Sequence, residues 1–109
     1  MIEDLKINRI EFLHVCNTLE SAMKLRDGTH WVTFHFTPGK LEMISSWGGG
    51  RVSTDGKETV SGKIAYNHVK RLIFSQGLKK LKKDTLSCIL APKHGKLIIE
   101  NAALKMAFL

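Results

Sequence analysis

Apolar and polar positions along the chain predict a short strand followed by a helix at its beginning. Residues 4–7 alternate in the way that a half-buried strand does, and after Asn8 the apolar side chains recur every three or four positions until about Leu25. Asn8 followed by Glu11 three positions later is typical of a capped helix start. We therefore expect a helix that begins after Asn8.

Three β-type runs follow this helix, with turn residues between them. Residues 30–36 are rich in β-branched and aromatic side chains, and a turn at 37–40 leads to a returning run at 41–46. Three glycines at 48–50 predict either a flexible loop or a bulged, sharply bent strand that leads into residues 51–53. These runs predict a hairpin and a third strand.

The second half of the chain repeats this order of elements. A strand at residues 59–64 precedes a helix that we expect Asn67 to cap and Gly77 to end. Residues 78–83 are either a linker or a further helical turn. The closing strands are predicted at 85–91, 96–100 and 103–108.

The two halves also match in sequence at a nearly constant spacing. Lys6 and Lys63 stand 57 positions apart and Leu41 and Leu97 stand 56 apart, each pair in a similar local sequence. We therefore predict a tandem duplication of a β-α-β-β-β unit, with repeat one at about 4–53 and repeat two at about 58–109. The expected fold class is α+β, a single domain of residues 1–109 with two helices packed on antiparallel sheet or sheets.

The length and composition are those of one ordinary domain. The chain has 109 residues, of which 43% are hydrophobic, and this is enough to bury a core. Its beginning shows no basic flank before an apolar run, and no stretch approaches the ~20 apolar residues that a membrane span needs. We expect a cytoplasmic protein with no membrane partner.

The net charge of +7 is concentrated in one half of the chain. Residues 1–54 hold six Lys and Arg against six Asp and Glu, whereas residues 55–109 hold eleven against four. Such an asymmetry indicates a polyanionic or acidic partner that meets one region of the surface. A solvated basic face that only aids solubility is the alternative.

The basic residues of the second half include a cluster on and after the predicted second helix. Clusters of this kind attract phosphate backbones without reading sequence, because counterions are released. Phe74 is the only aromatic residue in this stretch, which favours duplex backbone contact over single-strand stacking. Acidic proteins attract such a cluster too. The predicted nucleic-acid-binding residues are Lys70, Arg71, Lys79, Lys80, Lys82 and Lys83.

No motif in the chain predicts an enzyme or a cofactor. Cys16 and Cys88 lack Cys-x-x-Cys spacing, which favours small core residues over a disulfide or a zinc site. His30 and His35 stand five apart on a predicted strand and so point to opposite faces. Neither His-x-x-x-His spacing nor a Gly-x-Ser-x-Gly motif occurs. We expect no catalytic residue, metal site or cofactor.

The order of elements resembles one domain of a DNA sliding clamp, the processivity factor of DNA polymerases. The resemblance covers nearly the whole chain and rests on spacing rather than on one invariant motif. The matching segments are Leu5–Ile7 before Glu11–Leu13, the hairpin strand Gly39–Ile44, Val60–Ile64 leading into Val69–Leu72, and the closing runs Asp84–Leu90 and Gly95–Glu100.

The resemblance implies a DNA-clamp-like function in DNA replication. In that family the helices line the hole of a ring, and their basic residues contact the DNA backbone without sequence preference. Lys70 and Arg71 match that role best, Arg9 and Lys24 match it less well, and residues 79–83 lie beyond the helix. Sliding clamps join two or three such domains in each chain, whereas this chain has one. A ring would therefore need several copies pairing edge to edge as a homo-oligomer.

Two functions follow as expectations. The first is a non-enzymatic domain that binds duplex DNA, independent of sequence, through its basic helix surface. The alternative is a protein-interaction module, such as an inhibitor or immunity-type protein, whose basic surface binds an acidic protein partner. The fold by itself does not distinguish between them.

Overall fold

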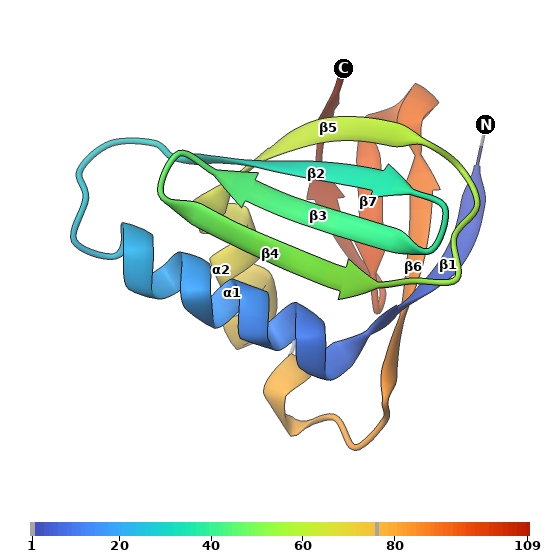
Figure 1. Ribbon diagram of the computed structural model, residues 1–109, viewed down its shortest axis with the longest axis horizontal. Coiled ribbons are helices and arrows are strands. Elements are labelled where there is room, and N and C mark those ends of the chain that lie inside the picture. The colour runs from blue at the N-terminus through green and yellow to red at the C-terminus, as the bar shows by residue number, and fades with distance from the viewer. Residues whose placement is uncertain (1, 76) are drawn as a thin grey trace.

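The computed structural model describes residues 2–75 and 77–109, which form two antiparallel sheets and two α-helices (Figure 1). The predicted α+β class with helices packed on antiparallel sheets is confirmed. The elements in chain order are β1 (Glu3–Asn8), α1 (Arg9–Met23), β2 (Trp31–Thr37), β3 (Lys40–Ser45), β4 (Gly48–Ser53), β5 (Val60–Ala65), α2 (Tyr66–Ser75), η1 (Leu78–Lys80), β6 (Thr85–Ala91), η2 (Pro92–His94), β7 (Lys96–Ile99), β8 (Ala102–Lys105) and β9 (Ala107–Phe108).

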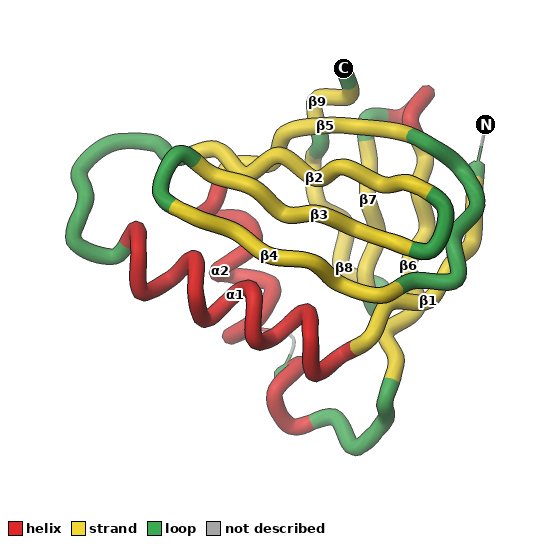
Figure 2. The backbone as a smooth tube through the Cα atoms, in the orientation of Figure 1, coloured by secondary structure: helices red, strands yellow, loops and turns green. Residues whose placement is uncertain are grey.

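Each sheet combines strands from both halves of the chain. One sheet has the strand order β1-β6-β7-β8, and the other has the order β4-β3-β2-β5-β9. The first strand of each half pairs with the strand that follows the helix of the other half. β1 pairs with β6, with Leu5 opposite Cys88, and β5 pairs with β2, with Ile64 opposite Val32. Figure 2 shows the strands of one sheet running across the view and those of the other running up and down it. Neither half completes a sheet alone.

The last predicted strand is in fact two strands in different sheets. β8 pairs with β7, whereas β9 pairs with β5, so the chain crosses between the sheets at the buried Met106. Gly62 makes this crossing sterically feasible, because a Cβ there would lie 2.5 Å from Met106 Cγ and Sδ. The run of residues 103–108 is apolar except for Lys105, and nothing in it indicates this change of partner strand.

Helix α1 starts as predicted and ends earlier than predicted. The Asn8 side chain accepts a hydrogen bond from the Glu11 backbone N–H at 2.9 Å, which satisfies one of the free donors of the first turn. The helix ends at Met23 instead of Leu25. Leu25 is 89% exposed, so it has no core contact that would favour another helical turn.

The three glycines at 48–50 form a regular strand, and the expectation of a loop or a bulge is wrong. β4 pairs with β3 residue for residue, from Ser45 opposite Gly48 to Lys40 opposite Ser53. The glycines are explained by close packing instead. A Cβ on Gly50 would lie 2.7 Å from Val15 Cγ2 of α1, and one on Gly49 would lie 2.1 Å from the Met43 carbonyl oxygen.

Helix α2 follows β5 without a connecting loop. It begins at Tyr66, so Asn67 lies inside the first turn and does not precede it as a cap. The Tyr66 backbone N–H donates to the His30 carbonyl oxygen at 2.8 Å. Beyond the helix, Gly77 takes a left-handed conformation with φ of +64°, and a 3₁₀ turn follows with Leu78 fully buried. Of the two alternatives for residues 78–83, a linker or a further helical turn, the helical turn is observed at residues 78–80.

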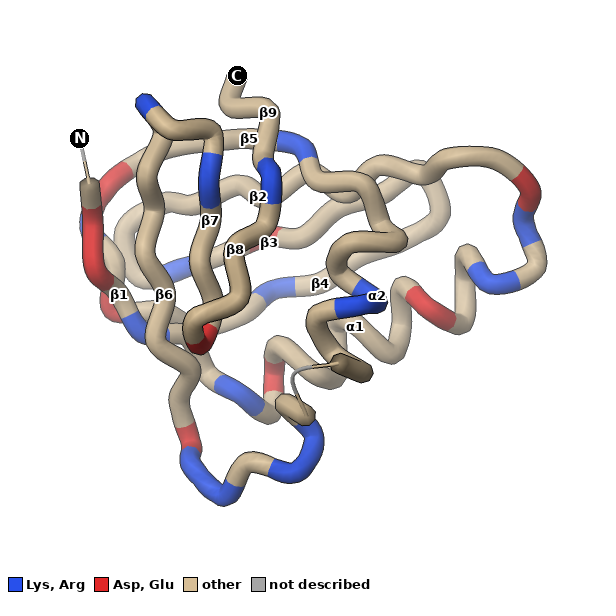
Figure 3. The backbone as a smooth tube through the Cα atoms, turned by 180° about the vertical axis from the view of Figure 1, so that it is seen from behind, with Lys and Arg blue, Asp and Glu red and all other residues tan. Residues whose placement is uncertain are grey.

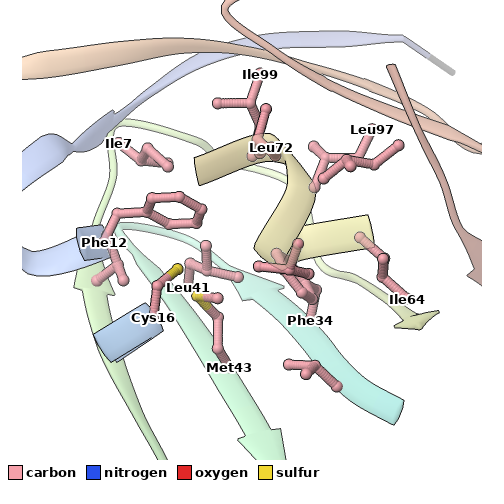
Figure 4. Packing of buried hydrophobic residues seen from close by; sticks show 14 of the residues in the cluster. Ile7, Phe12, Cys16, Phe34, Leu41, Met43, Ile64, Leu72, Leu97 and Ile99 are labelled. Carbon is pink, nitrogen blue, oxygen red and sulfur yellow. The ribbon is translucent and has the colours of Figure 1, made fainter. Parts of the chain in front are cut away.

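The core lies between the sheets and the two helices. Figure 4 shows Phe12 and Cys16 of α1 directed toward Leu41 and Met43 of β3. Both cysteines, Cys16 and Cys88, are buried and free, as the sequence predicted. Burial raises the pKa of each thiol to about 12, so neither is reactive near neutral pH. Among the described residues, no helix is long and apolar enough to cross a membrane.

Candidate nucleic-acid interface

The six predicted basic residues occupy one continuous part of the chain, which we call the basic surface. Lys70 and Arg71 lie on α2, Lys79 and Lys80 lie in η1, and Lys82 and Lys83 lie in the loop before β6; all six are exposed. In Figure 3, Lys and Arg mark α2 and the protruding loop on the same view of the molecule. The residues are Lys70, Arg71, Lys79, Lys80, Lys82 and Lys83.

The η1 turn holds its lysines outward because its apolar side chain is anchored. Leu78 is fully buried and the Lys80 N–H donates to the Gly77 carbonyl oxygen at 2.9 Å. Lys79 Nζ lies 4.9 Å from the centre of the Phe74 ring, a cation–π contact at a ring that is 58% exposed. The ammonium group of Lys79 therefore lies over the Phe74 ring. The η1 turn exposes the charged side chains of Lys79 and Lys80 to solvent.

Lys83 is part of a structural network at the base of the loop. Its Nζ lies 2.7 Å from Glu100 Oε2, and its carbonyl oxygen accepts from Arg9 Nε at 2.6 Å. Glu100 Oε1 also accepts from the Ser87 N–H at 2.8 Å. Partial burial raises the pKa of Glu100, but the hydrogen bonds from Lys83 and Ser87 outweigh it and hold the pKa below its ordinary value. This network connects the loop to α1 and to the β7–β8 turn.

Lys70 is paired as well, at the contact between the two helices. Its Nζ lies 3.3 Å from Glu20 Oε1 of α1, and the Tyr66 hydroxyl donates a hydrogen bond to the same carboxylate. The hydrogen bond from Tyr66, followed by that from Lys70, lowers the pKa of Glu20. Burial and this carboxylate raise the pKa of Tyr66. Lys70 is still half exposed, but part of its charge is neutralised by Glu20.

Four of the six predicted cations have no carboxylate within ion-pair distance in the part of the chain that the structure describes. The sequence could not separate them from Lys70 and Lys83. The partners of those two, Glu20 and Glu100, lie in other elements and 50 and 17 residues away. The unpaired cations of the basic surface are Arg71, Lys79, Lys80 and Lys82.

Two of the five histidines, His30 and His35, have hydrogen-bond partners nearby in the fold. His35 Nδ1 shares a hydrogen bond with Ser61 Oγ on the neighbouring strand β5. His30 Nε2 donates to the Arg26 carbonyl oxygen at 3.3 Å. Within residues 2–75 and 77–109, no three His, Cys, Asp or Glu side chains lie close enough together to hold a metal ion.

A groove that sequence reasoning missed lies where the chain crosses between the sheets. We call it the crossing groove; it has a volume of about 590 Å³ and an apolar floor that includes Ala65, Leu104 and Met106. Its charged and titratable lining residues are all basic, and no Asp or Glu is among the described residues that line it. Those basic residues are Lys63, His68, His94, Lys96 and Lys105, which are spread too widely in the sequence to be noticed as a cluster.

Comparison with known proteins identifies no relative of this chain. No family model, no curated protein and no solved structure matches it. Its function is therefore argued from its own residues.

Proposed function

We propose that this chain is a duplicated, clamp-like domain without enzymatic activity that binds the backbone of duplex DNA through its basic surface. The observation that carries the proposal is the set of four exposed, unpaired cations along α2, η1 and the following loop. Lys and Arg contacts to phosphate fix position without reading bases, so the binding is independent of sequence.

The sheet topology supports the duplication on which this proposal rests. The order β1-β6-β7-β8 places the first strand of the first half beside three strands of the second half. The order β5-β2-β3-β4 places the first strand of the second half beside three strands of the first. Apart from β9, which adds a fifth strand beside β5, exchanging the halves leaves this strand order unchanged. That is the relation expected between two copies of one unit.

Backbone contact by four cations makes a quantitative prediction about salt. Each phosphate that is neutralised on B-DNA contributes roughly −0.9 to the slope of log affinity against log salt concentration, so four contacts contribute about −3.6. Lys70 and Lys83 contribute less, because Glu20 and Glu100 already hold them.

A single domain cannot surround DNA, so the clamp-like function needs a homo-oligomer. β4 and β8 each lie at one end of a different sheet, and each has one edge without a paired strand among the described residues. Met106 N donates to the Gly95 carbonyl at 2.8 Å, so the alternate residues Ala103 and Lys105 direct their backbone groups away from β7. Head-to-tail pairing of β8 with β4 of the next copy, with a rotation between copies that closes on itself, is the arrangement that the proposed ring requires. Light scattering that finds only a monomer with DNA present would rule out this ring.

The proposal is tested by removing the unpaired cations and comparing with an equal charge change elsewhere. The test variant is R71Q/K79Q/K80Q/K82Q, and the control K6Q/R51Q/K57Q/K93Q also replaces one Arg and three exposed Lys. In a fluorescence polarisation titration with a labelled duplex at low salt, we expect the test variant to lose at least about tenfold in affinity. The control should lose about threefold or less. Equal losses, or no binding by the wild-type chain, would reject the proposal.

The crossing groove favours a second candidate function, the recognition of an acidic protein. Its apolar floor suits an apolar side chain, and its five basic groups suit flanking carboxylates. This candidate predicts that Lys63→Glu together with Lys105→Glu abolishes capture of one acidic protein and lowers duplex affinity by about threefold or less, as in the control with the same change of net charge. Unchanged capture of that acidic protein by the variant would reject this candidate. A loss of duplex binding larger than that of the control would mean that DNA binds at the crossing groove and not at the basic surface.

A further inference from the structure

Both tryptophans of the chain line one open trough, away from the basic surface. Trp31 begins β2 and Trp47 lies in the β3–β4 turn, and the trough between them has a volume of about 530 Å³. Trp31 is 53% exposed and Trp47 is 45% exposed. In Figure 1 this turn and the loop after α1 lie at one end of the molecule, and the loop before β6 lies at its lower edge. We call this site the tryptophan trough.

The fold fixes the backbone positions of both tryptophans. Thr33 of β2 pairs with Ile44 of β3, so the register brings Trp31 beside the β3–β4 turn. Within the turn, Ser45 Oγ donates to the Gly48 carbonyl oxygen at 2.8 Å and accepts from the Trp47 N–H at 3.1 Å. The trough is therefore built on a hydrogen-bonded sheet and a hydrogen-bonded turn.

Basic side chains contact Trp47 and line the trough. The Arg26 guanidinium carbon lies 3.5 Å from the centre of the Trp47 ring, and the His30 ring meets Trp47 edge-on with 6.5 Å between centroids. Lys63 lines the trough from β5. No Asp or Glu is among the described residues of its lining. An aromatic surface with cations and without carboxylates matches a ligand that has π-faces and negative charge.

We propose that the tryptophan trough binds single-stranded nucleic acid. Bases stack on Trp31 and on the Trp47 side that Arg26 leaves uncovered, and phosphates pair with Lys63 and Arg26. The hydroxyl-bearing residues of the lining, Thr29, Thr33, Ser45 and Ser46, can hydrogen-bond base edges and sugars. These polar walls favour a nucleic acid over an acidic protein, for which the more apolar crossing groove is better suited.

This site is separate from the basic surface and would bind a different form of nucleic acid. The loop before β6 contacts the start of α1 through Arg9, whereas the tryptophan trough lies beside the loop that follows the end of α1. The helix has 15 residues and is therefore roughly 22 Å long. In a duplex the bases are stacked inside and cannot reach the tryptophans, whereas in a single strand they can.

The intrinsic fluorescence of the protein provides a direct test. Both tryptophans of the chain line the trough, and Trp31 also borders the crossing groove, so Trp47 is the ring that reports on the trough alone. We expect an unlabelled oligothymidylate to quench the fluorescence saturably at low salt. This quenching should persist in Trp31→Phe, where Trp47 is the remaining tryptophan. With a labelled oligothymidylate, Trp31→Leu should lose about tenfold in affinity and Trp31→Phe much less, because phenylalanine retains a stacking face. Lys63→Gln should reduce the salt slope by about 0.7.

Two comparisons separate this proposal from the duplex-binding proposal. R71Q/K79Q/K80Q/K82Q should retain quenching by oligothymidylate, and the double variant Trp31→Leu, Trp47→Leu should retain duplex binding. Circular dichroism on each variant checks that it is folded. The proposal is overturned if oligothymidylate causes no quenching, if the leucine and phenylalanine variants bind it equally, or if an oligoglutamate peptide quenches as strongly. The last result would assign the trough to an acidic protein.

Discussion

The two α-helices each follow the first strand of their half of the chain, but they meet their surroundings differently. α1 lies so close to β4 that Gly50 has no room for a Cβ beside Val15. α2 is shorter, ten residues against 15, and leads through Gly77 into the exposed lysines of η1. The charges follow the same division, with a sum of zero over residues 1–54 and +7 over residues 55–109.

The two halves have the same order of elements but use it differently. In the first half the helix packs closely on the sheet, and in the second half the helix and the turn after it carry exposed basic side chains. Substitutions beneath α1 should reduce the free energy of unfolding and leave ligand binding unchanged in the folded fraction. Substitutions on the outer side of α2 and η1 should do the reverse. The following predictions test this division, from the largest expected effect to the smallest.

Gly50→Val should be the most destabilising of these changes. Its Cβ would lie 2.7 Å from Val15 Cγ2, and the added methyl groups would push α1 away from β4. Overpacking of this kind costs about 2–3 kcal/mol in the free energy of unfolding, which urea denaturation measures. Arg51→Val, on the same strand and exposed, should change that free energy by less than about 0.5 kcal/mol. Equal stability of the two variants would contradict the close packing of α1 on β4.

Glu100→Gln should have an intermediate effect that depends on pH. The variant loses the ion pair with Lys83 and weakens the hydrogen bond from Ser87, a loss of about 1–2 kcal/mol at pH 7. The folded pKa of Glu100 lies below its ordinary value. Its contribution is therefore present above the unfolded pKa of about 4.3 and is lost as pH falls through the folded pKa.

The measurement is urea denaturation of wild type and variant from pH 7 to pH 3. The difference in unfolding free energy between them should shrink as the pH falls. Glu58→Gln is the control, because the Glu58 side chain makes no hydrogen bond or ion pair within the described residues. A difference that stays constant over this pH range would show that the Glu100 carboxylate is not held by Lys83 and Ser87.

Glu20→Gln should have the smallest effect, and it should act on binding. The change removes the carboxylate that pairs with Lys70, so this lysine becomes available to phosphate. Duplex affinity should rise by about two- to threefold, and the salt slope should steepen by about 0.9. Polarisation titrations at several salt concentrations measure both quantities. A fall in duplex affinity would mean that the Glu20–Lys70 pair positions the basic surface instead of weakening it.

The sequence predicted the elements well because apolar periodicity and turn residues are local signals. The capped start of α1 and its apolar stripe depend on residues three or four apart. The pairing of β1 with β6, the crossing at Met106 and the role of Gly50 depend on distant segments, and no local pattern contained them.

The same limit applies to the candidate sites. The sequence identified six exposed cations, but the pairing of Lys70 and Lys83 depends on carboxylates in other elements. Trp31 and Trp47 are 16 residues apart, and no local pattern in the sequence relates them. The β2–β3 hairpin brings both to one trough. The number of charged residues in a segment can be read from the sequence, whereas the ion-pair partner of each charge is known only from the folded structure.

The measurement that tests the proposed function most directly is the salt dependence of duplex binding by the wild-type chain and the two four-residue variants. We predict that the slope of log affinity against log salt concentration becomes shallower by about 3.6 in R71Q/K79Q/K80Q/K82Q. It should stay nearly unchanged in K6Q/R51Q/K57Q/K93Q. Identical slopes in all three proteins, or no duplex binding at low salt, would contradict the assignment of the basic surface to DNA.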